Sequence, residues 1–262
     1  MKAGVHELRL FFTALQFFTR LPVPRWVGFE PAWLHACARY FPLVGLLVGA
    51  VAAVVYAAAL RVTSPAVAAV LSTLATVVLT GAFHEDGLAD TCDALGGHVP
   101  RARALEIMKD SRIGSYGAIA LVLVVGLKLA VLAALPVTLA VPALLFAHTV
   151  SRAMAVVVIR ALPYAGDVAA AKARPLAQRV RRREVAIALV TTVIVAAVLV
   201  AVRPPWAVPL GGATALALVG AHACARRWHR RLGGFTGDTL GATQQVTEVL
   251  ALLGWLVWLR LL

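Results

Sequence analysis

Long apolar stretches that carry almost no charge recur along this chain. Each is close to the roughly 20 residues that a helix needs to cross the hydrocarbon core of a bilayer. Because the stretches are unbroken and do not alternate polar with apolar residues, they predict helices rather than the strands of a membrane barrel. Seven such stretches lie at 38–60, 65–83, 115–135, 139–162, 185–202, 206–225 and 243–262.

The composition excludes two other classes of protein. Of the 262 residues, 61% are hydrophobic and 14% are charged, whereas a soluble domain is roughly 45–50% apolar and about 25% charged. There is too little polar surface for a soluble globule, and the chain is too apolar to be disordered. We therefore predict an all-α fold, a polytopic integral membrane helical bundle of about seven transmembrane helices. It forms a single domain over residues 1–262.

Residues 4–18, ahead of the first apolar stretch, mix apolar with charged side chains and precede Pro22 and Pro24. This pattern is typical of an interfacial helix that lies on the membrane surface. A short helix packed against the bundle is the alternative. The two prolines set the end of the helix in either case, because proline disfavours the helical conformation of the residue before it.

The distribution of Lys and Arg predicts the orientation of the chain. If the N-terminus lies inside and seven spans alternate, the inner segments hold 20 of the 25 Lys and Arg residues and the outer segments hold three. The positive-inside rule then places the N-terminus and the long loops in the cytoplasm. The net charge of +13 reflects loops at anionic headgroups, so we expect no nucleic-acid partner. The arginine-rich segment 172–183 is interpreted as such a loop.

Acidic residues gather in one short region of a chain that has few of them. Six of the twelve carboxylates fall between residues 85 and 110. Asp86, Asp90 and Asp93 are spaced i, i+4, i+7, which places them on one face of a helix. Three carboxylates so close repel one another, and Mg²⁺ or Mn²⁺ would remove that repulsion. The spacing therefore predicts a Mg²⁺ site, and a solvated acidic helix end is the alternative.

Two further segments resemble substrate-binding loops. Lys109 and Arg112 flank Ser111, and Gly114 follows at the start of the third span. Such cations beside a glycine-bearing helix start predict a phosphate site, although juxtamembrane cations also contact lipid headgroups. In the last inner loop, 233–243, Asp238 is the one acid among four glycines. Glycine lets a ligand approach the backbone closely, which favours a functional role for this loop over a flexible turn.

Charged residues within the spans are costly and are candidates for function. Lys128 falls in the third span and Glu248 in the seventh, and we expect them to form a structural ion pair. Arg152 falls in the middle of the fourth span, where it shares a helix face with His148. Arg152 is expected to contact a phosphate or an acid that lines the interior.

These motifs together resemble those of the cobalamin synthase family, the adenosylcobinamide-GDP ribazoletransferases. The resemblance covers nearly the whole chain, and it depends on several motifs in the same order rather than on any one. The motifs lie at Phe18–Pro24, Phe41–Gly45, His84–Asp93, Ile107–Gly114, Ser151–Arg152 and Gly233–Ala242.

The resemblance implies a Mg²⁺-dependent enzyme of the bacterial cytoplasmic membrane. The family transfers phosphocobinamide from adenosylcobinamide-GDP to α-ribazole or its 5′-phosphate, releasing GMP in the last stage of cobalamin synthesis. Two residues depart from the family pattern: Ala94 stands where glycine is commoner, and Glu85 stands where an apolar residue is accepted. Neither removes a predicted ligand. A second copy of the chain and other cobalamin-assembly enzymes are the expected protein partners.

Combined with the residue chemistry, this implies a division of roles. Asp86, Asp90 and Asp93 would hold Mg²⁺ on the diphosphate. His84, or one of the carboxylates, would accept the proton of the ribose hydroxyl, since histidine titrates near neutral pH. The residues assigned to phosphate and substrate are Lys109, Ser111, Arg112, Gly114, Arg152 and Asp238.

Two other functions share part of this pattern. A membrane phosphotransferase of the CDP-alcohol type also places carboxylates at helical spacing beside a membrane surface, but its Asp-Gly-x-x-Ala-Arg run is absent here. A cation transporter would carry acids in the middle of its spans, whereas only Glu248 clearly lies within one. Release of GMP rather than CMP, or uptake of ions, would separate the three functions.

Overall fold

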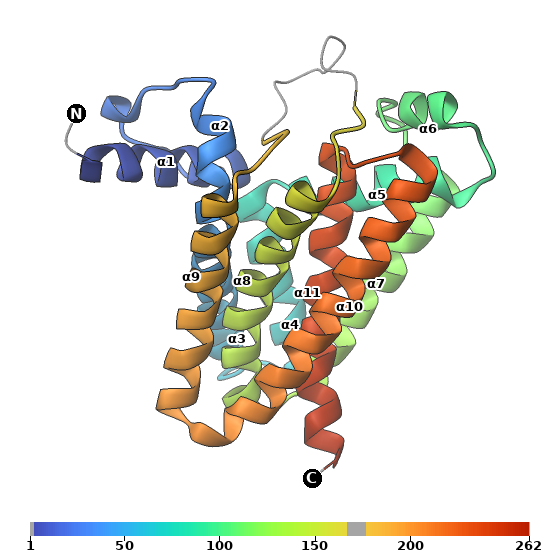
Figure 1. Cartoon of the computed structure of the whole chain (residues 1–262). Helices are drawn as coiled ribbons and strands as arrows, with labels where there is room; N and C mark the ends of the chain where they lie inside the picture. The colour runs from blue at the N-terminus through green and yellow to red at the C-terminus, as the bar shows by residue number, and fades with distance from the viewer. Residues whose placement is uncertain (1–2, 167–176, 262) are drawn as a thin grey trace.

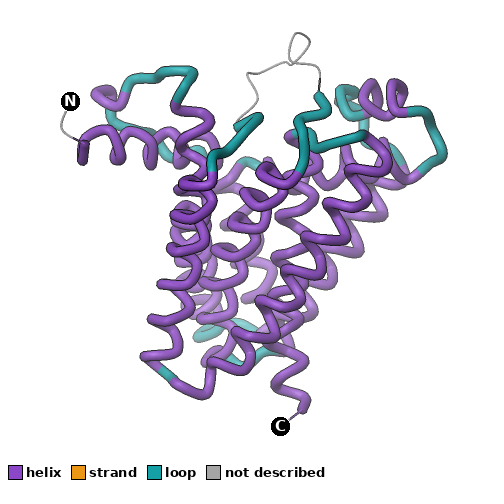
Figure 2. The backbone as a smooth tube through the Cα atoms, in the orientation of Figure 1, coloured by secondary structure: helices purple, strands orange, loops and turns teal. Residues whose placement is uncertain are grey.

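The computed structural model describes residues 3–166 and 177–261, and this part of the chain is almost wholly helical (Figure 2). Its one β-bridge joins Tyr164 to Phe235. The helices are α1 (Ala3–Phe18), α2 (Trp33–Ala36), α3 (Phe41–Ala59), α4 (Pro65–Thr80), α5 (Phe83–Gly96), α6 (Arg101–Ile107), α7 (Ser115–Ala134), α8 (Val137–Ala161), α9 (Arg182–Val202), α10 (Ala207–Leu232) and α11 (Gly237–Leu261).

The predicted membrane-spanning bundle is confirmed. Within residues 3–166 and 177–261, six helical segments are long and apolar enough to cross a membrane, and the pair α4 and α5 makes up to seven if it counts as one span. The N-terminus and C-terminus lie at opposite ends of the bundle (Figure 1), as the predicted alternation of seven spans requires. We call the end that carries α1, α5 and α6 the α1–α6 end. The chain is a multi-pass membrane protein.

Three predicted boundaries were wrong. The second stretch was expected to continue as one helix to residue 83, but α4 ends at Thr80 and the chain bends by 89° into α5. Gly81 and Ala82 both have a positive φ, at 69° and 59°, which breaks the helix. α10 continues beyond residue 225 to Leu232, and α11 begins at Gly237 rather than at 243. Asp238 therefore belongs to a helix start rather than to a loop.

Helix α1 packs across the α1–α6 end of the bundle (Figure 1). It buries Leu10, Ala14 and Phe18 against the core and leaves Leu8 half exposed. The structure therefore shows that α1 packs on the bundle with one face, and the predicted interfacial position of its other face stays a prediction. Of the arginine-rich segment 172–183, residues 172–176 lie outside the described part of the chain.

Helix α8 lies at the centre of the bundle and is buried along most of its length. α3 packs very closely against it because two glycines face α8. A Cβ atom at Gly45 would overlap the backbone of His148, and one at Gly49 would lie 2.8 Å from the Leu144 carbonyl oxygen. Small residues at one face allow such close approach of membrane helices. This packing fixes the polar face of α8, which carries His148 and Arg152.

Candidate active site

Helix α5 carries the acidic motif and lies across the α1–α6 end of the bundle (Figure 1). The predicted helical spacing of its aspartates is confirmed, since α5 is continuous from Phe83 to Gly96. Asp86 lies in its first turn, where a negative charge interacts favourably with the helix dipole. Asp86 is exposed and Asp90, one turn later, is partly buried. The two carboxylates project from neighbouring positions on one face.

The start of α11 brings a further carboxylate to this face. Thr236 and Thr239 cap the helix reciprocally, because the backbone N–H of each donates to the hydroxyl of the other, at 2.8 and 3.3 Å. This capping box places Asp238 in the first turn of α11. Gly87 of α5 lies against it, since a Cβ there would be 2.9 Å from the Asp238 carbonyl oxygen.

Asp86 and Asp238 are consequently close enough for their charges to interact. We call these two residues the acid pair. In the described part of the chain, neither carboxylate pairs with a cationic side chain. The chain has 25 Lys and Arg residues, so two neighbouring acids without a basic partner are unexpected for a structural arrangement. They favour the binding of a cation from outside the chain.

Asp93 has a different set of contacts from Asp86. Its carboxylate accepts hydrogen bonds from the backbone N–H groups of Gly114, at 2.7 Å, and Gly117, at 2.8 Å. These are free donors at the start of α7, so Asp93 caps that helix. A Cβ atom at either glycine would overlap the Asp93 carboxylate. Asp93 thereby fixes the 107–114 segment against α5.

The predicted phosphate segment lies in the exposed connection between α6 and α7. Ser111, Arg112 and Gly114 are exposed. The Arg112 guanidinium donates to the Asp110 carboxylate at 2.6 Å, and these hydrogen bonds lower the pKa of Asp110 to about 2. Lys109 is exposed and engaged in an interaction of its own.

The connection between α6 and α7 also reaches the loop before α11. The Thr236 hydroxyl lies 3.7 Å from the Met108 sulfur atom. Together with the Gly87 contact and the Asp93 cap, this brings three predicted motifs to one end of the bundle: residues 84–93, 107–114 and 233–238. These motifs are far apart in the sequence, and contacts between different helices bring them together.

Deeper in the bundle lies a network of buried charges, and the predicted ion pair is confirmed there. The Lys128 ammonium donates to the Glu248 carboxylate at 2.5 Å, and His148 Nδ1 lies 2.9 Å from its other oxygen. Arg152 is 2% exposed and donates to the His148 carbonyl oxygen at 3.1 Å. Arg152 also lies near enough to Glu248 and Glu85 for their charges to interact, and its contact with substrate stays a prediction.

His84 lies at the bundle interior rather than on the exposed face of α5. Its ring is buried, stacks on Phe18 with centroids 5.5 Å apart, and leaves Nε2 without a hydrogen-bond partner in the described residues. The charges near it are those of Arg152 and the buried network. The structure does not place the His84 ring with the acid pair, and its role as a base stays a prediction.

The predicted magnesium ligands, Asp86, Asp90 and Asp93, do not all converge on one point. Among the described residues, no group of three or more His, Cys, Asp or Glu side chains is arranged to hold a metal ion. Asp93 faces α7 instead, so the three aspartates do not converge as a set. What remains is the acid pair with Asp90 one turn away. That number of oxygen donors fits Mg²⁺, which usually takes one or two carboxylates and completes its shell with water and substrate phosphates.

Several polar residues of the interior were missed in the sequence. Gln244 donates to Glu248 at 2.5 Å and to Ser151 at 3.2 Å, and Gln245 donates to Glu85 at 3.1 Å. The signal was available, because two adjacent glutamines in an apolar span are costly unless they have partners. Glu85, set aside as a departure from the family pattern, thereby links α5 to α11.

Comparison with known proteins decides the family. The family model described as cobalamin-5-phosphate synthase matches residues 10–256. The chain belongs to the cobalamin-5-phosphate synthase family. A relative from Leptothrix cholodnii, named adenosylcobinamide-GDP ribazoletransferase, is 54% identical over 98% of this chain and 99% of its own length.

Relatives with the same name come from other bacteria as well. Those of Shewanella pealeana and Albidiferax ferrireducens are 45% and 46% identical, covering 95% and 94% of this chain and 95% and 97% of their own length. No solved structure matches the chain. As a member of this family the chain is a transferase of cobalamin biosynthesis. The resemblance inferred from the motifs is therefore confirmed.

Proposed function

We propose that the protein is an adenosylcobinamide-GDP ribazoletransferase. It would transfer phosphocobinamide from adenosylcobinamide-GDP to a ribose hydroxyl of α-ribazole or of its 5′-phosphate, forming adenosylcobalamin or its 5′-phosphate, and release GMP. Family membership and the names of the relatives support this activity. The observation in the structure that supports it best is the acid pair, which lies beside the cationic 107–114 segment at one end of the bundle.

The reaction is a phosphoryl substitution. The hydroxyl oxygen forms a bond to the phosphorus that carries the cobinamide, and the bond from that phosphorus to the oxygen bridging the diphosphate breaks. GMP leaves with the bridging oxygen, and the hydroxyl proton goes to a base. Such reactions depend on positioning and on neutralising the phosphate charge.

Mg²⁺ is the proposed cofactor, held by the acid pair, Asp86 and Asp238, with Asp90 one turn away. When bound, the ion would neutralise diphosphate oxygens and stabilise the charge on the leaving GMP. Asp93 keeps α7 and the 107–114 segment against α5. In this proposal it is a positioning residue rather than a ligand.

Lys109 and Arg112 supply the remaining positive charge. Both are exposed in the connection between α6 and α7. Arg112 would exchange its Asp110 partner for a phosphate, whose oxygens match the guanidinium fork. Ser111 and the backbone N–H groups near Gly114 would add hydrogen bonds to the substrate. Arg152 is buried near Glu248, so in this proposal it holds the buried network in place and does not contact the diphosphate.

For the proton acceptor, the geometry favours one of the carboxylates at the α1–α6 end over His84. The acid pair lies beside the predicted phosphate segment, whereas the His84 ring faces the buried network. A His84→Gln variant tests this choice. We expect its pH–rate profile to match that of the wild type, and a profile that loses a limb would assign the base to His84.

The proposed location is the cytoplasmic (inner) membrane of a bacterium, with the N-terminus and the active site on the cytoplasmic side. The 20-to-3 distribution of Lys and Arg supports this orientation. The substrates, the lipid bilayer and a second copy or another cobalamin-assembly enzyme would be the partners.

The direct test of the activity uses the purified full-length protein. It is incubated with adenosylcobinamide-GDP, α-ribazole and Mg²⁺, and the released nucleotide is identified by chromatography. We expect GMP to appear with an equal amount of adenosylcobalamin. The proposal would be contradicted if the folded protein released no GMP, or if it released CMP from a CDP-alcohol substrate.

A further inference from the structure

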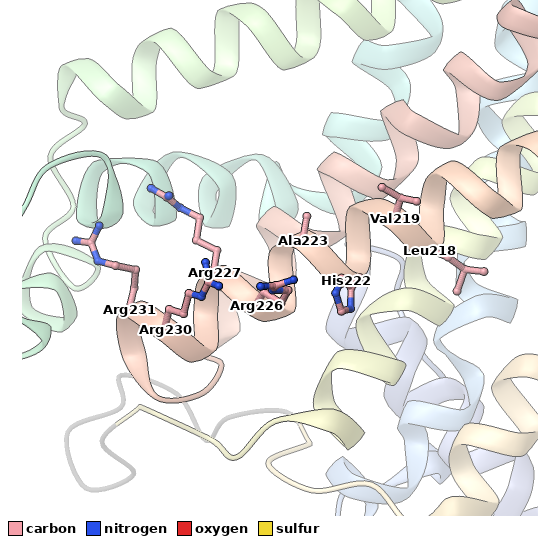
Figure 3. Close-up of a pocket in the computed structure, with 8 residues that line it drawn as sticks. All are labelled: Leu218, Val219, His222, Ala223, Arg226, Arg227, Arg230 and Arg231. Atoms are coloured by element: carbon pink, nitrogen blue, oxygen red, sulfur yellow. The ribbon is translucent and has the colours of Figure 1, made fainter.

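A groove of about 680 Å³ runs along α10, and Asp86 and Asp238 are not among the residues that line it (Figure 3). Its lining comes from two adjoining rows of that helix, each spaced by four residues. Figure 3 shows the arginines gathered at one end of the groove and the apolar side chains at the other. The rows consist of Leu218, His222, Arg226 and Arg230, and of Val219, Ala223, Arg227 and Arg231.

The four arginines divide into two pairs. Arg227 donates to the Leu95 carbonyl oxygen at 2.8 Å, and Arg231 donates to the Gly97 carbonyl oxygen at 2.9 Å. These two cations cap the C-terminal end of α5, where the helix dipole is negative. Arg226 and Arg230 are exposed and have no hydrogen bond or ion pair with any described residue. Two adjacent guanidinium groups are thus open to a ligand.

The other end of the groove faces the lipid region. Leu218 is 50% exposed and Val219 is 64% exposed, and both belong to a span that is apolar enough to cross the membrane. From Leu218 to Arg230 the helix rises by roughly 18 Å, which is close to half the thickness of the hydrocarbon core, about 15 Å. A ligand that fills the groove would have a long apolar part and an anionic end.

We propose that this groove binds an anionic phospholipid. The phosphate headgroup would lie on Arg226 and Arg230, since guanidinium groups bind phosphate oxygens in pairs, and one acyl chain would lie along Leu218 and Val219. A soluble phosphate would leave the apolar wall unused, so the lipid is the better match. The bound headgroup would neighbour Arg227 and Arg231, and would thereby stabilise the end of α5.

Native mass spectrometry of the purified full-length protein tests the proposal without an activity assay. The protein in detergent is titrated with phosphatidylglycerol and, separately, with phosphatidylcholine, and the retained lipid is counted. We expect one phosphatidylglycerol to be retained in preference to phosphatidylcholine. An Arg226→Gln/Arg230→Gln variant should bind it roughly tenfold more weakly or worse, because two cations that face an anionic headgroup are lost.

A matched control removes the same charge elsewhere at the same end of the bundle. Arg181 and Arg182 are exposed at the start of α9 and line no part of the groove. Arg181→Gln/Arg182→Gln should leave the retention of phosphatidylglycerol unchanged. If both double variants bound phosphatidylglycerol equally weakly, the binding would reflect general charge attraction and the proposal would be overturned. Equal retention of phosphatidylglycerol and phosphatidylcholine by the wild type would also overturn it.

Two further arms separate the lipid from a soluble anion. Val219→Asn should weaken binding, whereas glycerol 3-phosphate at the concentration of the lipid should not displace it. Displacement by glycerol 3-phosphate would identify a site for soluble phosphate and contradict the lipid assignment. Arg226→Lys/Arg230→Lys keeps the charge, and we expect it to retain most of the binding.

Discussion

Two regions of the molecule hold acidic side chains, and they differ in how those acids are compensated. Inside the bundle, Glu248 contacts Lys128, His148 and Gln244. At the α1–α6 end, Asp86 and Asp238 lie beside each other without a cationic partner among the described residues. Glu248 therefore has a structural role, because a buried charge needs a partner. We propose that the unpaired region binds a cation and the substrate.

We expect the largest loss of stability when the buried ion pair of Glu248 is broken. Lys128→Met leaves the Glu248 carboxylate buried without its ammonium partner, and we expect a loss of about 3–5 kcal/mol in the free energy of unfolding. Thermal unfolding of the purified protein in detergent measures this. Lys128→Met/Glu248→Gln should recover much of the loss. A single variant as stable as the wild type would show that the pair contributes nothing.

The next effect concerns the unpaired region. Asp86→Asn should lower the rate of GMP release on the order of 100-fold, because several kcal/mol of charge stabilisation in the transition state are lost. Its unfolding temperature should stay near that of the wild type, since Asp86 is exposed and pairs with no described cation. Steady-state kinetics and thermal unfolding are measured on the same preparation.

Glu106→Gln is the matched control for Asp86. Glu106 is an exposed acid of the same region, paired with Arg103 at 3.0 Å. Exposed pairs contribute little, so we expect wild-type turnover. If Asp86→Asn also kept wild-type turnover, the acid pair would have no part in the reaction.

A third prediction separates a cap from a ligand. Asp93→Asn weakens two charge-assisted hydrogen bonds to backbone N–H groups at the start of α7, and we expect a loss of about 1–3 kcal/mol in stability. Binding of Mn²⁺ as a probe for Mg²⁺ should persist in this variant. If the variant lost Mn²⁺ binding but kept its stability, Asp93 would be a metal ligand rather than a helix cap.

The smallest effect is a local pH dependence in the 107–114 segment. Arg112 holds the pKa of the exposed Asp110 at about 2. Because the pKa is lowered, the contact is fully present above the ordinary value of 3.8 and is lost as the pH falls through about 2. In Arg112→Gln the pKa of Asp110 should rise toward its ordinary value, as NMR titration of the labelled carboxyl group would show. An unchanged titration would refute the pairing in solution.

Much of this fold could be predicted because lipid leaves a chain few choices. Without water to satisfy the backbone, long apolar stretches form helices, and charges within them need partners. That is why the spans and the Lys128–Glu248 pair were predicted correctly. The bend at Gly81 was missed because the apolar pattern continues through residue 83, although glycine is a common helix terminator.

The site was predictable in its parts but not in its assembly. Helical spacing put Asp86, Asp90 and Asp93 on one face, yet it could not indicate that Asp93 would bind the backbone of α7. Equally, nothing local to Asp238 shows that the close contact at Gly87 brings it beside Asp86. Both facts depend on contacts between segments far apart in the chain, which spacing along one helix does not report.

We propose that the acid pair holds a divalent cation, and electron paramagnetic resonance of bound Mn²⁺ tests this claim. The purified protein is titrated with Mn²⁺ in the presence of adenosylcobinamide-GDP, and the free and bound ion are measured. We predict one bound ion in the wild type and in Glu106→Gln, and its loss in Asp86→Asn and Asp238→Asn. An ion that binds equally well to all four proteins would contradict the claim.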